Sequence, residues 1–211
     1  MNPYYQDAVV TIYHGDCRAL LAGLPNVDVA LITDPPYGLG YKPLRGSNGS
    51  KMWGEEVVTG DAESFDPAHL LGFPRLVLWG AQFYAAALPR SGGWIVWDKT
   101  PKGIREGFIY SHAELAWTNQ GQRVRKFSLD WQGNARNSEP FLHPTQKPEP
   151  LMRWCIENYA QAGDLIIDPY CGSGTTLRAA KDLGRRAIGI EIEERYCEVA
   201  ARRLAQEVLT I

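Results

Sequence analysis

The sequence predicts an α/β protein in which a mostly parallel β-sheet carries helices on both faces. Short apolar runs rich in Val, Ile and Trp recur along the chain, and several are separated by segments whose apolar residues have helical spacing. This alternation is typical of parallel strands connected by helices. In addition, two of the runs end in proline or glycine turns that carry acidic residues, as expected at the carboxyl edge of such a sheet.

The predicted elements follow the chain in a regular order. The apolar runs place strands at residues 9–13, 29–33, 76–79, 94–97, 114–117, 165–167 and 187–190. The segments with helical spacing place helices at residues 81–88, 151–159, 175–183 and 194–204. Around residues 127–129 the pattern allows one further short strand.

The length of the chain favours one domain. A chain of 211 residues with 45% hydrophobic residues suits one large domain, residues 1–211, or two small ones. Two stretches interrupt the alternation: residues 38–64 are rich in glycine, and residues 119–143 are polar and irregular. A long connection without periodicity is usually functional or disordered, so we expect 38–64 to be a mobile loop.

Positive charge gathers in these irregular stretches although the whole chain has a net charge of -2. Residues 42–51 carry three basic and no acidic side chains, and residues 99–136 have a net charge of +4. Solvated surface charge is the usual explanation of such clusters, and a local basic groove for nucleic acid is the functional one. The overall charge excludes only a protein that is basic throughout.

The cysteines indicate a reduced protein. Cys17, Cys155, Cys171 and Cys197 form no C-x-x-C pair and no zinc-ligand spacing, so we expect neither a disulfide scaffold nor a metal site. The N-terminal residues lack the basic and apolar regions of a signal peptide, and no apolar stretch reaches membrane-spanning length. We therefore expect a cytoplasmic protein with no membrane partner.

The first motif is T-D-P-P-Y-G at residues 33–38, directly after an apolar run. Proline cannot donate to a sheet ladder and biases the preceding residue toward extended geometry, so Asp34-Pro35-Pro36 ends the strand and stiffens the turn after it. A carboxylate, free carbonyls and the ring of Tyr37 are thereby held at the edge where open α/β sheets bind ligands. A rigid loop whose tyrosine packs on the sheet is the plain alternative.

The second motif, residues 164–176, is a strand that enters a glycine turn and opens a helix. Gly172 and Gly174 let the backbone approach a ligand closely, and the helix start at Thr175 offers free N–H groups. The next predicted strand ends in Glu191, 19 residues after Gly172, where an acid can accept hydrogen bonds from ribose hydroxyls.

The charge of the second motif distinguishes between two nucleotide cofactors. The motif G-x-G-x-x-G of dinucleotide-binding sites is incomplete here, because Leu177 stands at the position of its third glycine. Asp168 precedes the loop, and its carboxylate favours a cationic cofactor and repels a pyrophosphate. S-adenosylmethionine carries an ammonium and a sulfonium and fits this site. A structural cap is the alternative role of Asp168.

Three motifs in this order resemble the DNA amino-methyltransferases that modify adenine N6 or cytosine N4. They are Asp34-Pro35-Pro36-Tyr37, then H-P-T-Q-K-P at residues 143–148, then D-P-Y-C-G-S-G-T-T at residues 168–176. The catalytic motif precedes the cofactor motif, as in the β class of that family. The resemblance covers about residues 9–204 and implies a circularly permuted, Rossmann-like methyltransferase fold with a mostly parallel seven-stranded sheet and helices on both faces.

The resemblance also implies the site residues. The catalytic set would be Asp34, Pro35, Pro36 and Tyr37. The S-adenosylmethionine site would comprise Asp16 and Cys17 near the adenine, the segment Thr145, Gln146 and Lys147 at the methionine end, and Asp168, Pro169, Tyr170, Gly172, Ser173, Gly174, Thr175, Thr176 and Glu191. Tyr170 departs from the phenylalanine frequent in the family but retains an aromatic ring. The basic residues expected to contact DNA are Lys42, Arg45, Lys51, Arg123, Arg125, Lys126 and Arg136.

By the same resemblance we expect site-specific methylation of adenine N6 in double-stranded DNA, because aspartate at the first motif position is commoner for N6 enzymes. N4-cytosine methylation and a catalytically silent DNA-binding homologue are the alternatives. Cytosine-C5 methylation requires a Pro-Cys dipeptide, which the chain lacks. Glutamine and RNA methyltransferases use a related Asn-Pro-Pro-Tyr motif, but in those families the cofactor motif precedes the catalytic motif.

The short recognition insert, residues 119–143, suggests a compact phage or prophage type. A homodimer and a cognate restriction endonuclease are further expected partners.

Overall fold

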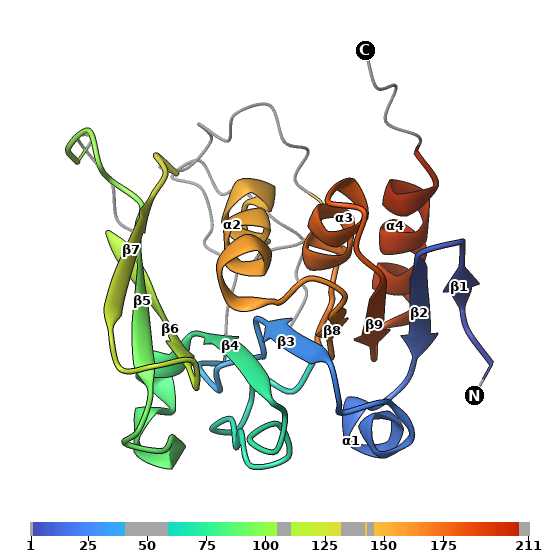
Figure 1. The fold of residues 1–211 in the computed structure, drawn as a ribbon, viewed down its shortest axis with the longest axis horizontal. Helices are drawn as coiled ribbons and strands as arrows, with labels where there is room; N and C mark the ends of the chain where they lie inside the picture. Colours follow the sequence, from blue (N-terminus) through green and yellow to red (C-terminus); the bar gives the residue numbers. More distant parts are fainter. Residues whose placement is uncertain (1, 41–58, 105–110, 132–141, 143–145, 207–211) are drawn as a thin grey trace.

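The computed structural model of the chain describes residues 2–40, 59–104, 111–131, 142 and 146–206. Within these residues, nine strands form one sheet with the order β1-β2-β9-β8-β3-β4-β6-β5-β7 (Figure 1). The strands are β1 (Tyr5–Gln6), β2 (Val10–His14), β3 (Val29–Thr33), β4 (Arg75–Trp79), β5 (Gly93–Asp98), β6 (Ala113–Thr118), β7 (Val124–Ser128), β8 (Leu165–Asp168) and β9 (Ala187–Glu191).

Five strands, β2, β9, β8, β3 and β4, form a continuous parallel centre. The edge strand β1 and the strand β6 pair antiparallel with their neighbours, and β7 pairs parallel with β5. The mostly parallel α/β sheet is therefore confirmed. The described sheet exceeds the expected seven strands because the two-residue β1 and the strand β7 are added at its two edges.

The order of the central strands agrees with a permuted methyltransferase sheet. The strand β8 before the second motif lies between β9 and β3, and β2 follows β9. Because β3 and β8 are parallel neighbours, with Leu31 opposite Ile167, the two motifs leave the sheet side by side. Segments more than 130 residues apart, such as Thr33 and Asp168, thus meet at one edge.

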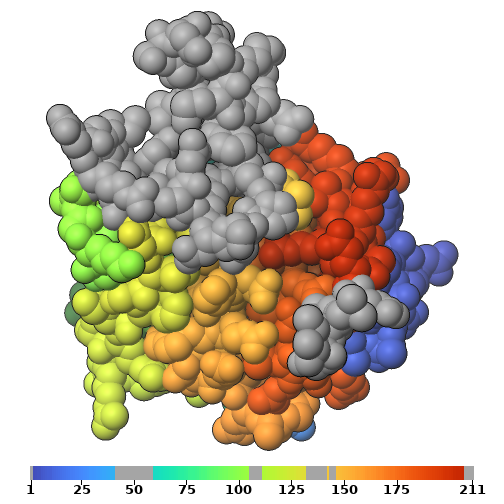
Figure 2. Space-filling model, turned by 90° about the horizontal axis from the view of Figure 1, so that it is seen from above, coloured from blue at the N-terminus to red at the C-terminus, as the bar shows by residue number. Residues whose placement is uncertain are grey.

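Side chains along β3 alternate between two cores, as the two-residue period of a strand requires. Ala30 and Ile32 join the core under the helices α2 (Glu149–Tyr159), α3 (Thr175–Asp182) and α4 (Glu194–Ala205). Val29 and Leu31 face the opposite side, which is covered by α1 (Cys17–Leu20) and by 3₁₀ turns (Figure 1). Seen from above, α2 lies between β7 and the pair α3 and α4 (Figure 2).

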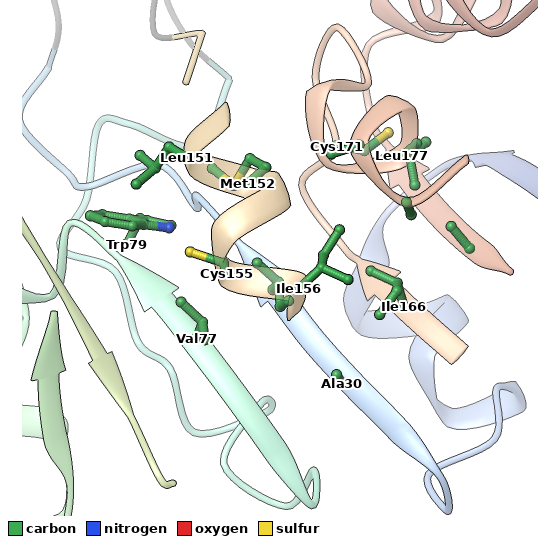
Figure 3. Close-up of a cluster of buried hydrophobic side chains, with 14 of the residues drawn as sticks. Ala30, Val77, Trp79, Leu151, Met152, Cys155, Ile156, Ile166, Cys171 and Leu177 are labelled. Carbon is green, nitrogen blue, oxygen red and sulfur yellow. The ribbon is translucent and has the colours of Figure 1, made fainter. Parts of the chain in front are cut away.

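The core under α2 is aliphatic and aromatic (Figure 3). Leu151, Cys155 and Ile156 point from the helix onto the sheet and are fully buried. Burial raises the pKa of the Cys155 thiol above its usual range, so this cysteine is a packing residue. The helix begins after Pro148, and its first turn contains Glu149 and Pro150, both favourable near a helix start.

The predicted helix at residues 81–88 is wrong. The chain forms two 3₁₀ turns there, Ala81–Phe83 and Ala85–Ala87, separated by Tyr84 with a non-helical backbone. The Tyr84 hydroxyl donates to the Trp79 carbonyl at 2.6 Å, and Pro89 biases the preceding residue toward extended geometry. Tertiary anchoring of the aromatic ring thus overrides the helical propensity of the alanines.

The other predicted helices and strands are confirmed with boundaries shifted by one or two residues, except that the strand allowed around residues 127–129 begins earlier, at Val124. Trp131 is buried against Trp97, with ring centroids 6.2 Å apart, so its role is packing. In the described part of the chain, no helix has both the length and the apolar character needed to cross a membrane.

Candidate active site

A cavity of about 560 Å³ opens at the carboxyl ends of β2, β9, β8 and β3. Its wall contains residues 34–37 of the first motif, Pro169, Tyr170 and Gly172 of the second, and Asp16, Cys17 and Glu191 from the neighbouring strand ends. A smaller cavity of about 40 Å³ adjoins it and is lined by Asp34, Gln146, Lys147, Asp168, Tyr170, Gly172, Ser173, Thr175 and Thr176, among others. The sheet therefore brings most of the described predicted site residues together.

Asp34 lies at the centre of a buried polar network. Its Oδ1 accepts a short hydrogen bond from the Tyr37 hydroxyl, and its Oδ2 pairs with the Lys147 ammonium at 2.5 Å. Lys147 also contacts the Tyr37 hydroxyl at 3.0 Å and Glu114 Oε2 at 3.2 Å. Burial raises the pKa of Asp34 and Lys147 opposes that shift. The ion pair thus favours a charged carboxylate in a largely dry site.

The Tyr37 ring packs against a glycine and a phenylalanine. Phe83 stacks on it with centroids 5.1 Å apart and planes 26° apart. A Cβ at Gly80, whose φ is +71°, would lie 1.8 Å from the ring, so the glycine is required for the ring to lie there. Burial and the adjacent carboxylates keep the pKa of Tyr37 well above its usual value, so its hydroxyl is a donor.

Asp61 holds the turn that comes after the two prolines. Its Oδ1 accepts three consecutive backbone N–H groups, from Tyr37 at 3.0 Å, Gly38 at 2.8 Å and Leu39 at 3.2 Å. Gly40 donates to the Asp61 carbonyl at 2.8 Å. Asp61 is buried, so these charge-assisted bonds fix the turn firmly.

Asp168 is buried beneath the glycine turn. Its Oδ1 accepts from the Thr33 hydroxyl at 2.6 Å and from the Tyr170 N–H at 3.2 Å. Burial raises the pKa of Asp168 to about 6, against the opposing effect of the hydrogen bonds from Thr176 and Thr33. A buried carboxylate with a raised pKa has a high affinity for a cationic group that would restore its charge balance.

Glu191 connects the second motif to the end of β9. Its Oε2 accepts the Gly172 N–H at 2.8 Å and its Oε1 accepts the Glu193 N–H at 2.8 Å. Burial raises the pKa of Glu191, and the two amides counteract this. Asp16 caps α1 by accepting the Arg18 N–H at 2.9 Å. Two acids, Asp16 and Glu191, therefore line the large cavity, where hydroxyl and amine donors would be bound.

The predicted DNA contacts are only partly within the described residues. Lys42, Arg45, Lys51 and Arg136, together with Thr145 of the cofactor set, lie outside them. Arg125 stacks on Trp154 and Tyr159 and donates to Asn158, at the end of α2 away from Lys147. Lys126 pairs with Asp98 at 3.2 Å, and Arg123 lies beside the start of β5.

Sequence reasoning missed four residues of the site: Asp61, Phe83, Lys99 and Glu114. Lys99 donates to Glu114 Oε1 at 2.7 Å, which ties Glu114 into the network around Lys147. Glu114 offered a signal, because it is an acid at the start of an apolar run in a predicted strand. The other three have no local pattern that marks them.

The fold and this site define a Rossmann-like methyltransferase. Residues 116–202 match a family model described as DNA methylase. A type II methyltransferase, M2.DpnII of Streptococcus pneumoniae, is 28% identical over 98% of this chain and 93% of its own length. The solved complex of M1.HpyAVI with S-adenosylmethionine covers 92% of this chain and 99% of its own, at 24% identity and a TM-score of 0.54.

The cytosine-N4-specific PvuII DNA methyltransferase covers 99% of this chain and 90% of its own, at 16% identity and a TM-score of 0.63. Taken together, the family model and the curated relatives support a member of the N6/N4 DNA methylase family, in which the methyl donor is S-adenosylmethionine. The residues of the site fit this cofactor, because the buried carboxylate of Asp168 suits a cation and the carboxylate of Glu191 suits ribose hydroxyls.

Proposed function

We propose that the chain transfers a methyl group from S-adenosylmethionine to the exocyclic N6 of adenine in double-stranded DNA. One observation carries the proposal: the Asp34 carboxylate, paired with Lys147 and Tyr37, opens into the same cavity as Glu191 and the second motif. An acceptor for an amine and the acids for a nucleoside cofactor thus share one site. The other assigned roles of the site residues are part of this proposal.

The first motif would activate the target amine. The lone pair of an exocyclic amine is delocalised into the base, which makes the nitrogen a weak nucleophile. If Asp34 accepts one N–H and the Pro35 carbonyl accepts the other, the nitrogen approaches tetrahedral geometry and its lone pair becomes available. When bound, S-adenosylmethionine supplies an electrophilic methyl group on a sulfonium. The chain contributes orientation and hydrogen-bond polarisation, with no covalent intermediate.

Tyr37 would receive the base. A base must leave the duplex to reach the cavity, which costs a few kcal/mol, and stacking on an aromatic ring offsets part of that cost. The Tyr37 ring is already immobilised by Phe83, by its hydroxyl bond to Asp34 and by the Asp61 contact to its N–H, so little side-chain entropy is lost on stacking.

Adenine is favoured over cytosine by the aspartate of the first motif. The N4-cytosine alternative is kept, because the same fold occurs in the cytosine-N4-specific PvuII enzyme. A catalytically silent homologue is disfavoured by the intact arrangement of Asp34, Tyr37 and Glu191. Double-stranded DNA is the proposed substrate, a homodimer and a cognate restriction endonuclease are the predicted partners, and 38–64 and 119–143 are the predicted DNA-facing segments.

Nucleoside mass spectrometry of DNA from cells that express the protein tests the proposal. We expect N6-methyladenine in the wild type and neither modified base with Asp34→Ala. Calorimetry should show that the purified, folded Asp34→Ala variant still binds S-adenosylmethionine, because the carboxylates assigned to the cofactor are intact. N4-methylcytosine without N6-methyladenine would overturn the base assignment. Loss of donor binding in the folded variant would contradict the role given to Asp34.

A further inference from the structure

We propose that Glu114 is a positioning residue for methyl transfer, which acts on the catalytic carboxylate of Asp34 by sharing the ammonium of Lys147. The proposal rests on the proposed function, because it assumes that Asp34 is the acceptor for the target amine. Glu114 lies on β6, beyond the parallel centre of the sheet, and it contributes to the wall of the large cavity.

Three oxygens surround the ammonium of Lys147. They are Asp34 Oδ2 at 2.5 Å, the Tyr37 hydroxyl at 3.0 Å and Glu114 Oε2 at 3.2 Å. The oxygens of Asp34 and Tyr37 accept hydrogen bonds from the ammonium, whereas Glu114 Oε2 contacts it as an ion pair without a hydrogen bond. Lys147 is 6% exposed, and little water is available to replace a lost partner. Glu114 is therefore needed for a fully compensated ammonium.

Lys99 fixes the second oxygen of Glu114. Its ammonium donates to Oε1 at 2.7 Å and lies 5.0 Å from the centroid of the Trp97 ring. Burial would raise the pKa of Glu114, but Lys147 and Lys99 lower it to about 2. Glu114 is thus charged throughout the working pH range. Four side chains from separate parts of the sequence form an alternating row, Asp34, Lys147, Glu114 and Lys99, with no net charge.

The row explains how Asp34 stays ionised and still accepts a hydrogen bond from the substrate. A lysine paired with Asp34 alone would concentrate its charge on that carboxylate and weaken it as an acceptor. Because Glu114 also attracts the ammonium, Asp34 is a stronger hydrogen-bond acceptor than it would be if it were the only carboxylate paired with Lys147. Within the part of the chain that the structure describes, the remaining groups facing Asp34 are the Tyr37 hydroxyl, Asp168 from β8 and the Tyr84 hydroxyl. None of these is a cation that could replace Lys147.

The test compares Glu114→Gln, which removes the charge and keeps the shape, with Lys99→Met, which leaves Glu114 charged but unshielded. Methyl transfer to DNA is measured at saturating S-adenosylmethionine across the acid pH range. We expect Glu114→Gln to lower kcat by about 10- to 100-fold, as expected when a reacting group is misplaced, with unchanged KM for the donor. Glu198→Gln, on the exposed side of α4, is the matched control and should match the wild type.

The acid limb of the kcat profile distinguishes positioning from simple structural support. Loss of the negative charge at Glu114 lowers the pKa of Asp34, so the fall of kcat at acid pH moves to lower pH. Loss of the positive charge at Lys99 raises the pKa of Asp34, so the fall of kcat moves to higher pH. Wild-type kcat in Glu114→Gln, or shifts of both variants in the same direction, would overturn the inference. Methylation by Asp34→Ala would instead overturn the proposed function, so the two failures are distinguishable.

Discussion

Asp61 accepts the backbone N–H of Tyr37 at 3.0 Å through the same carboxylate oxygen that accepts the next two N–H groups along the chain. One oxygen thereby fixes the position of the aromatic residue predicted to receive the target base. Its partners lie more than 20 residues away in the sequence, on the other side of residues 41–58. The catalytic turn is therefore held from outside its own motif.

Asp61→Ala is expected to lower kcat by about 10- to 100-fold, because the displaced turn misaligns Tyr37 and the neighbouring Pro35 carbonyl. Three amides would lose their acceptor, and we expect the free energy of unfolding to fall by about 1–3 kcal/mol. Methyl transfer assays and chemical denaturation measure the two effects. Donor affinity should change little, because the three amides that Asp61 Oδ1 holds belong to the catalytic turn and not to the second motif.

Asp61→Asn is the matched conservative variant, since its amide oxygen can still accept the three N–H groups, and it should recover most of the activity. Asp66→Ala, which removes a single local acceptor for the Ala68 N–H, is the control for general effects on this segment. Equal activity of Asp61→Ala and Asp66→Ala would show that the turn does not depend on the buried carboxylate.

Gly80→Ala is expected to remove most of the activity through Tyr37. The added Cβ would lie 1.8 Å from the Tyr37 ring, and the left-handed backbone at Gly80 strains any L-residue. The ring must leave its stack with Phe83, so kcat should fall while donor binding remains. Gly72→Ala is the control, because nothing lies within 4 Å of its added Cβ and its backbone is unstrained. Wild-type kcat in Gly80→Ala would exclude a fixed Tyr37 ring as a requirement.

The fold could be predicted further than the site. Apolar periodicity located most strands, because a buried strand carries its signal locally. The resemblance implied a permuted methyltransferase fold, and the structure shows its central strands in the order β2-β9-β8-β3. The failure at residues 81–88 arose because the anchoring of Tyr84 to the Trp79 carbonyl is a tertiary contact. Propensity over eight residues contains no information on that bond.

The site residues that were missed depend on strand order beyond the parallel centre. Glu114 reaches Lys147 only because the antiparallel strand β6 lies next to β4. Arg125 was predicted to contact DNA from its position in a basic stretch, and that contact stays a prediction. In the structure its guanidinium stacks on aromatic rings at the far end of α2. Charge along a sequence does not indicate which face of a sheet bears it.

Ile156→Ala should destabilise the protein without altering the chemistry. Ile156 is fully buried between α2 and the sheet (Figure 3), so the truncation leaves a cavity and should lower the free energy of unfolding by about 2–5 kcal/mol. Chemical denaturation measures this. Val124→Ala, at an exposed position of β7, is the control and should change stability by less than about 0.5 kcal/mol. A loss for Ile156→Ala as small as that of the control would mean that this core can collapse around the truncated side chain.

Donor affinity is expected to depend on pH through Asp168. The pKa of Asp168 is raised to about 6, so its carboxylate is ionised above that pH and neutral below it. A cationic donor favours the ionised form, which predicts constant affinity above about pH 7 and a loss of about tenfold for each pH unit below 6. Calorimetric titration of S-adenosylmethionine at several pH values measures the midpoint.

The Thr33 hydroxyl stabilises the charged carboxylate through its 2.6 Å bond, so Thr33→Val should raise the pKa of Asp168 and move this midpoint to higher pH. Thr118→Val is the control, because its hydroxyl is also buried on a strand but accepts only from the Gln120 N–H. A shift in Thr33→Val that is absent from Thr118→Val identifies Asp168 as the titrating group. An unchanged midpoint in Thr33→Val would assign the pH dependence to another acid of the cavity, with Glu191 the next to be replaced.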